Sequence, residues 1–178
     1  MSHYKVKAAK HLLDSDIKAI LHFWEMHTLT PDAFREKFKN SEFHLVKDYS
    51  STIRAVARVN FDFKLRINEQ LFAYPEFGGF VALPQGKGYG TELLQYLIQN
   101  LKKRKLEALG FCEKPLRPYY EKCGIRILYD QAKFLRTAEQ NEWIPSSDDD
   151  ILDLTLSPAS WQQLQSLSPA NLAYLVED

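Results

Sequence analysis

The most informative segment of the sequence is Phe80-Val81-Ala82-Leu83-Pro84-Gln85-Gly86-Lys87-Gly88-Tyr89-Gly90-Thr91-Glu92-Leu93-Leu94. It runs from apolar residues that predict a strand, through a loop rich in glycine, into a helix that begins near Gly90. The helix prediction rests on apolar residues that recur on one face, namely Leu93, Leu94, Leu97, Ile98 and Leu101. The first N–H groups of a helix lack intrahelical acceptors, and the macrodipole adds partial positive charge there. Because glycines let this backbone close around a bulky anion, the segment predicts a phosphate or pyrophosphate site.

Three other phosphate-binding loops do not match this glycine pattern. A P-loop needs Ser or Thr after the Gly-Lys pair, whereas Lys87 is followed by Gly88. A dinucleotide-binding fingerprint reads G-x-G-x-x-G, whereas the spacing from Gly86 to Gly90 is G-x-G-x-G. A kinase loop would need Asp-bearing catalytic and metal-binding motifs, which we do not find. An ordinary glycine-rich turn that caps the helix is the alternative without a ligand.

The hydrophobic pattern on either side of this loop predicts a mixed α/β protein. Alternating side chains over residues 53–65 predict a strand, and the polar residues 68–70 predict a hairpin that returns through residues 74–83. Further strands are expected at 4–9, 42–47, 106–112, 125–129 and 151–156, with helices at 15–24, 31–38 and 116–122. Since no repeat or linker interrupts this order, we expect one domain over residues 1–178, with an extra helical tail at about 157–178.

A second motif lies downstream, at Tyr119-Tyr120-Glu121-Lys122-Cys123-Gly124-Ile125. Gly124 can end a short helix in a left-handed conformation, after which Ile125 begins the next strand. Tyr119 is the more natural core residue of the tyrosine pair. Tyr120 is either a packed aromatic with its hydroxyl tied to backbone or a participant in chemistry.

Together, the two motifs resemble those of the GNAT superfamily of N-acetyltransferases. Its Gln/Arg-x-x-Gly-x-Gly/Ala loop corresponds to residues 85–90, and its aromatic-Tyr-x-Lys-x-Gly-hydrophobic signature corresponds to residues 119–125. The resemblance covers about residues 76–125 and implies a mixed, largely antiparallel sheet flanked by helices. It also implies direct transfer of an acetyl group from acetyl-CoA to a primary amine in a ternary complex. No metal is implied, and a homodimer is allowed.

The resemblance further implies a cofactor site and a catalytic tyrosine. Tyr120 would be the general acid that protonates the leaving thiolate, since a phenol titrates at about 10. Two departures from the family pattern stand out: Ala82 where a proline is frequent, and Glu113 where many relatives have the Asn that contacts pantetheine. The residues expected to contact acetyl-CoA are Phe80, Val81, Ala82, Gln85, Gly86, Lys87, Gly88, Tyr89, Gly90 and Thr91.

The strand before the loop supplies two further candidates. Gly78-Gly79 predict either a bulge, whose backbone N–H would polarise the thioester carbonyl, or an ordinary strand with small residues. Glu76, which alternation places on the same face as Tyr74, is the candidate general base, acting directly or through water. Its alternative is an exposed carboxylate at the end of the strand. Cys123 has no histidine context that would make it a nucleophile, which favours a small packed residue.

The charge balance, the cysteines and the hydropathy of the sequence argue against several classes of protein. The 178 residues carry 23 Lys plus Arg and 23 Asp plus Glu, so bulk charge does not favour nucleic-acid binding. The two cysteines match neither a disulfide framework nor a metal-ligand spacing. The start lacks an apolar signal-peptide core and no stretch is apolar enough to cross a bilayer, so we expect a cytoplasmic protein.

The acceptor is the least defined part of the prediction. Acidic residues around Trp143 suggest a rim that attracts a cationic amine, or simply a solvated loop; they are Glu139, Glu142, Asp148, Asp149 and Asp150. The amine itself belongs to a small molecule or a protein. Three other functions remain open: a non-catalytic acyl-CoA-binding module or sensor, transfer of a different acyl group, and nucleotide binding.

Overall fold

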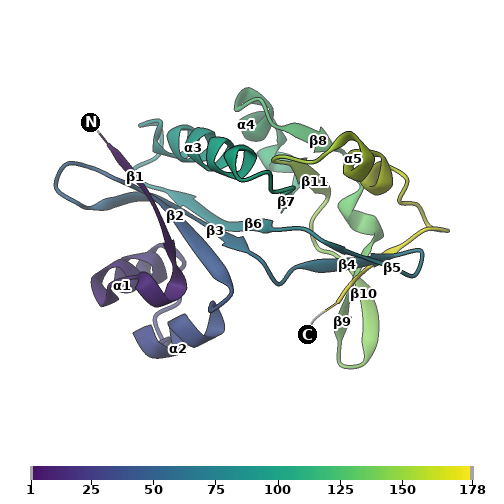
Figure 1. Ribbon diagram of the computed structural model, residues 1–178, viewed down its shortest axis with the longest axis horizontal. Coiled ribbons are helices and arrows are strands. Elements are labelled where there is room, and N and C mark those ends of the chain that lie inside the picture. Colours follow the sequence, from purple (N-terminus) through teal and green to yellow (C-terminus); the bar gives the residue numbers. More distant parts are fainter. Residues whose placement is uncertain (1, 177–178) are drawn as a thin grey trace. The chain divides into compact units, whose positions relative to one another are not determined.

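A computed structural model describes residues 2–176, and the chain divides into two compact units that interleave in sequence (Figure 1). Unit 1 holds the described residues up to Asn60 together with Phe77–Gln99. Unit 2 holds Phe61–Glu76 and the described residues from Asn100 onward.

Unit 1 is a sheet covered by helices on both faces. Its strands lie in the order β1 (His3–Ala8), β2 (Ser41–Lys47), β3 (Ile53–Asn60) and β6 (Glu76–Ala82). The pairs β1–β2 and β2–β3 are antiparallel. Helices α1 (Asp14–Phe23) and α2 (Pro31–Lys37) lie on one face, after a 3-10 turn at Ala9–His11, and α3 (Tyr89–Lys103) lies on the other (Figure 1).

Apolar side chains from α1, α2 and the sheet form the core of unit 1. Ile17 and Ile20 come from α1, Phe34 from α2, and Phe43 and Leu45 from β2, and all five are fully buried. On the opposite face, Tyr96 of α3 stacks on Tyr4 of β1 with ring centroids 5.0 Å apart. The helices therefore bury both surfaces of the sheet, which holds β6 and the start of α3 in place.

Unit 2 contains a five-stranded sheet in the order β10 (Glu142–Pro145), β9 (Leu135–Glu139), β12 (Ala173–Leu175), β4 (Lys64–Ile67) and β5 (Gln70–Ala73). Strand β12 pairs in parallel with β9 and antiparallel with β4. Strand β11 (Asp150–Asp153) pairs antiparallel with both β7 (Leu109–Cys112) and β8 (Arg126–Leu128). Helices α4 (Arg117–Lys122) and α5 (Pro158–Gln165) and 3-10 turns at Lys114–Leu116 and Ala132–Phe134 complete the unit.

These elements confirm the predicted fold class, a mixed α/β protein with largely antiparallel strand pairs flanked by helices. Two predicted elements need correction. The strand expected over residues 53–65 is broken by a turn after Asn60, so that β3 and β4 are separate. The tail expected to be helical over about 157–178 is helical only at Pro158–Gln165, because the chain then turns at Ser168–Asn171 and enters β12.

None of the helices within residues 2–176 has both the length and the apolar character that a membrane span requires.

Candidate functional site

The glycine loop of unit 1 joins β6 to α3, as the sequence predicts. Residues Leu83 to Gly88 are exposed to solvent, and Gly90 is buried in the first turn of α3. Gly86 and Gly88 have φ angles of 75° and 81°, in the left-handed region that favours glycine. A Cβ atom at either residue would meet no atom within 4 Å, so the backbone conformation, not a lack of space, requires glycine here.

The helix that follows these glycines presents its N-terminal end to the loop. The Glu92 N–H donates to the Gly88 carbonyl at 2.9 Å, so the N–H groups of residues 89–91 precede the first i−4 bond of the helix. Helix α3 is 15 residues long, and its N-terminal end is the positive pole of the macrodipole. An exposed loop of backbone N–H groups at this pole suits a phosphate group.

Strand β6 has an irregular backbone at Gly79, where a bulge is predicted. Gly79 has a φ of 57°, and its carbonyl accepts the indole N–H of Trp24 at 2.8 Å. The indole ring covers this glycine so closely that a Cβ atom on Gly79 would lie 2.5 Å from ring atom Cζ2. Trp24 is held in turn by the aromatic core, with ring centroids 6.0 Å from Phe34 and 5.6 Å from Phe38. The core of unit 1 thereby fixes the backbone of β6 just before the glycine loop.

The contact with Trp24 predicts that two adjacent glycines respond differently to substitution. Gly79→Ala is expected to destabilise the protein by more than the roughly 1–3 kcal/mol of backbone strain at a left-handed residue, because the new methyl group also overlaps the indole ring. Gly78→Ala is the matched control, since a Cβ atom there meets nothing within 4 Å. Chemical denaturation measures the free energy of unfolding of both variants, and equal losses would contradict this account.

The other candidates on or beside β6 differ in burial. Phe80, Val81 and Ala82 are half-buried, and Val81 packs against the core below α1 and α2. Glu76, the first residue of β6, is half-buried and belongs to unit 2. Tyr74 is buried, and burial raises the pKa of its phenol. Glu76 is thus the group of this segment that combines a titratable carboxyl with access to solvent.

Tyr120 lies on α4, and the end of this helix has the geometry that the second motif predicts. Gly124 has a φ of 76°. The Gly124 N–H donates to the Glu121 carbonyl, and the Ile125 N–H donates to the Tyr120 carbonyl at 3.1 Å. These two bonds are a Schellman motif, which ends a helix at a left-handed residue. The carbonyl of Tyr120 is therefore one of the groups that terminate the helix.

The structure corrects the assignment of the two adjacent tyrosines. Tyr120 is the buried one, only 5% exposed, whereas Tyr119 is half-buried and packs edge-on against it with centroids 5.4 Å apart. Burial raises the pKa of the Tyr120 phenol above its ordinary value, because the charged phenolate loses its hydration. A phenol in this state stays protonated throughout the physiological range, so it can donate a proton but cannot act as a base.

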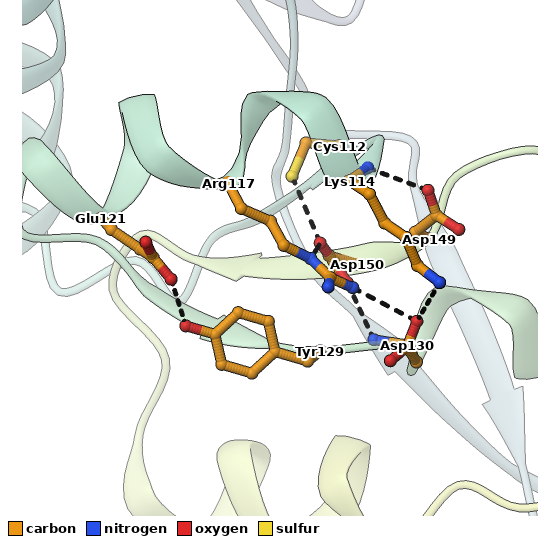
Figure 2. A network of polar contacts seen from close by, with 8 residues as sticks. All are labelled: Cys112, Lys114, Arg117, Glu121, Tyr129, Asp130, Asp149 and Asp150. Atoms are coloured by element: carbon orange, nitrogen blue, oxygen red, sulfur yellow. Dashed lines mark hydrogen bonds and ion pairs between the residues drawn. The ribbon is translucent and has the colours of Figure 1, made fainter.

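A network of polar side chains holds the N-terminal end of α4, and nothing in the sequence pattern predicted it (Figure 2). Arg117 donates from Nε and Nη2 to the two carboxylate oxygens of Asp150, each at 2.5 Å. Asp150 is fully buried and also accepts the Asp130 N–H at 2.8 Å. Lys114 pairs with the Asp130 carboxylate at 3.0 Å. The network joins α4 to β11 and to the residues that follow β8.

These contacts remove Asp150 from the acidic rim that the sequence suggests. Strand β11 already begins at Asp150, so its carboxylate is buried against Arg117 and is not available to an acceptor. Asp149 accepts the backbone N–H of Lys114 at 2.9 Å. Trp143 lies on a hairpin that the sequence analysis missed, β9–β10, which also carries Glu139 and Glu142 as a facing pair. Burial raises the pKa of the Asp148 carboxyl, and the negative charges of the Glu113 and Asp149 carboxylates add to the effect.

Neither cysteine is arranged as a nucleophile. Cys112 is buried opposite Asp150 in the β7–β11 ladder. Burial, together with the negative charge of Asp150, raises the pKa of the Cys112 thiol to about 12, which suppresses the reactive thiolate. Cys123, at the C-terminal end of α4, is of intermediate burial and is not part of a disulfide.

The predicted site residues fall into two groups. Phe80–Thr91, with the glycine loop and the start of α3, lie together in unit 1, beside the Trp24–Gly79 contact. Glu76 and Tyr120 lie in unit 2, where Tyr120 shares α4 with Arg117. Sequence reasoning missed both Trp24 and the Arg117–Asp150 pair, because each depends on a contact between residues far apart in the chain.

Comparison with known proteins identifies the family. The model of the acetyltransferase (GNAT) family matches residues 20–125 of the chain. A search among curated proteins found no match. The chain therefore belongs to the acetyltransferase (GNAT) family, because this match covers more than half of it.

Solved structures show the same fold at low sequence identity. A GNAT family N-acetyltransferase, YhbS from Escherichia coli in complex with CoA, is 10% identical with a TM-score of 0.61, over 99% of this chain and 89% of that chain. An N-acetyltransferase from Staphylococcus aureus Mu50 is 14% identical with a TM-score of 0.56, over 86% of this chain and 98% of that chain. A probable N-acyltransferase from Enterococcus faecalis V583 is 10% identical with a TM-score of 0.57, over 72% of this chain but only 33% of that longer chain.

Proposed function

We propose that the protein is an N-acetyltransferase that moves an acetyl group from acetyl-CoA to a primary amine. The observation that carries the proposal is the loop between β6 and α3, where Gly86 and Gly88 hold left-handed backbone angles in front of a helix N-terminus. Such a loop suits the pyrophosphate of CoA. The family match and the CoA in the E. coli relative support the same ligand.

The backbone of residues 85–91 would bind and orient the pyrophosphate, with the N–H groups at the start of α3 as donors. Because the donors are backbone N–H groups, the loop needs no particular side chain to bind the pyrophosphate, which agrees with its exposed glycines. The irregular backbone at Gly79 would present an N–H of β6 to the thioester carbonyl, and Trp24 would keep that segment in place.

The remaining steps are proton transfers by side chains of unit 2. Glu76 would accept a proton from the acceptor ammonium, directly or through water, so that a neutral amine can attack the thioester carbon. As the new C–N bond forms and the C–S bond breaks, Tyr120 would donate its phenolic proton to the departing thiolate, and the proton that the attacking nitrogen loses would return through water to the Tyr120 phenolate. No covalent enzyme intermediate is needed, because both substrates are bound together.

The proposal is tested in two stages on the unmodified chain. Calorimetry with acetyl-CoA, and with ATP and NAD as comparison ligands, should show binding of acetyl-CoA only. Release of CoA thiol is then followed with a panel of amines that includes polyamines, amino sugars and lysine peptides, and with succinyl-CoA in place of acetyl-CoA. Failure to bind acetyl-CoA would refute the proposal. Binding without turnover on any amine would favour a sensor. Faster turnover with succinyl-CoA than with acetyl-CoA would show that the protein transfers a succinyl group in preference to an acetyl group.

A further inference from the structure

We propose that the Arg117–Asp150 ion pair positions the phenol of Tyr120 for proton donation. The inference rests on the proposed role of Tyr120 and names a residue pair that acts through it. Neither Arg117 nor Asp150 needs to touch the substrates. Their part is to fix the helix on which Tyr120 stands.

Helix α4 depends on outside contacts for its position. It has six residues and no side-chain cap at its N-terminal end. An isolated helix of this length is unstable in water, because the cost of nucleation is not recovered over so few hydrogen bonds. Its placement must therefore come from tertiary contacts at its two ends.

The N-terminal end is fixed by a bidentate contact. Arg117, the first residue of α4, donates two hydrogen bonds to the two oxygens of Asp150. Parallel bonds from a planar guanidinium define an orientation as well as a distance. The Tyr129 ring lies over this guanidinium at 5.0 Å, and the Tyr129 hydroxyl donates to Glu121 on the same helix at 2.5 Å (Figure 2).

Asp150 is a rigid anchor for that contact. Its carboxylate is fully buried, and its backbone is held in the β7–β11 ladder opposite Cys112. One of its oxygens also accepts the Asp130 N–H. A carboxylate with this many fixed partners has little freedom to move. The guanidinium of Arg117, which binds both of its oxygens, is therefore held in a fixed position and orientation.

The position of Tyr120 follows from the two fixed ends. Tyr120 is three residues after Arg117, and residues at this spacing lie on the same side of a helix. The ion pair therefore sets the rotation of α4 about its axis, and with it the direction of the Tyr120 side chain. At the other end, the Tyr120 carbonyl accepts the Ile125 N–H of the Schellman motif. The contacts at the two ends of α4 therefore determine both its rotation about the helix axis and its position along that axis.

A second ion pair on the same strand provides a matched control. Arg126 on β8 donates from Nε and Nη2 to one oxygen of Asp153 on β11, at 2.9 and 2.5 Å. Its strand is already joined to β11 by the β8–β11 ladder, so this pair is not needed to orient α4. Arg126→Lys thus removes a similar guanidinium contact to a buried carboxylate without releasing Tyr120.

The test is a double-mutant cycle between Arg117→Lys and Tyr120→Phe. Lysine keeps the charge opposite Asp150 but cannot form the bidentate contact. The rate of CoA thiol release from acetyl-CoA is measured with the fastest acceptor of the amine panel, after subtraction of the rate without protein. A misplaced catalytic group typically costs on the order of 100-fold, so Arg117→Lys should lower kcat by roughly 10- to 100-fold. Its affinity for acetyl-CoA should stay within about twofold, since the glycine loop of unit 1 is unchanged.

The decisive result is the double variant. If Arg117 acts through Tyr120, Arg117→Lys/Tyr120→Phe should be no slower than Tyr120→Phe alone, while Arg126→Lys/Tyr120→Phe shows no such coupling. The inference would be overturned if the losses in kcat from Arg117→Lys and Tyr120→Phe multiply in the double variant. It would also be overturned if Arg117→Lys and Arg126→Lys change kcat equally. A Tyr120→Phe variant as fast as the unmodified chain would instead overturn the proton-donor role itself. If Arg117→Lys does not fold, Arg117→Gln/Asp150→Asn removes both charges together and enters the same cycle.

Discussion

Gly88→Asp is expected to lower the affinity for acetyl-CoA by about 100- to 1,000-fold. The substitution places a carboxylate in front of α3, where the pyrophosphate is proposed to bind. Two like charges about 4 Å apart near a protein surface repel by about 4 kcal/mol, and each 1.4 kcal/mol is about tenfold in affinity. Salt screening at this exposed loop sets the lower end of the range. Calorimetry with acetyl-CoA measures the change.

Gly88→Asn separates charge from backbone strain in this experiment. Asn has the same shape as Asp and tolerates the left-handed φ of 81° equally well, and the space around Gly88 is open to both. The Asn variant should therefore lose much less affinity, and only the Asp variant should recover in high salt. Equal losses for Asp and Asn would show that loop geometry matters and that no anion binds against this residue.

Tyr120→Phe is expected to lower turnover by about 100- to 10,000-fold, the usual contribution of a general acid. Removal of one oxygen atom leaves the packing of the buried ring almost unchanged. Affinity for acetyl-CoA should therefore remain close to that of the unmodified chain. Tyr119→Phe is the matched control, because Tyr119 is the neighbouring, less buried phenol on the same helix. Similar rates for Tyr119→Phe and Tyr120→Phe would return Tyr120 to a packing role.

The pH dependence of turnover gives a second check on Tyr120. Burial raises the pKa of its phenol above the ordinary value of about 10, so the proton is retained at every pH below that value. Loss of the proton from Tyr120 therefore cannot reduce kcat between about pH 7 and 10. A decline in this window that disappears in Tyr120→Phe would contradict the raised pKa.

Local patterns predicted most elements and both motifs. The glycine loop, the start of α3 and the left-handed Gly124 were predictable because each depends on a few neighbouring residues. The break between β3 and β4 was not, since the alternation of apolar residues continues across it. Ile53 packs in the core of unit 1, whereas Phe63 and Leu65 pack in the core of unit 2, although all three belong to the same alternating series in the sequence.

The elements that sequence reasoning missed depend on distant partners. The β9–β10 hairpin turns at Gln140 and Asn141, both with positive φ, but its polar strands show little hydrophobic alternation. Asp150 follows two other aspartates and reads as part of a solvated run. Only its partner on α4 reveals that it is buried. The sequence offers one signal that Asp150 is buried, namely its position directly before the apolar residues of a strand. This signal is weak without knowledge of the contact with Arg117.

The order of strands in unit 2 has a consequence for how the chain can be assembled during synthesis. The hairpins β4–β5 and β9–β10 are local, but β12 lies between them, and Ile67 pairs with Ala173. Until Ala173–Leu175 leave the ribosome, one edge of β4 and one edge of β9 have no partner, and open edges of this kind invite pairing with other chains. A deletion that removes β12 would leave two separate hairpins, so intermolecular association of nascent or truncated chains should begin at these two edges.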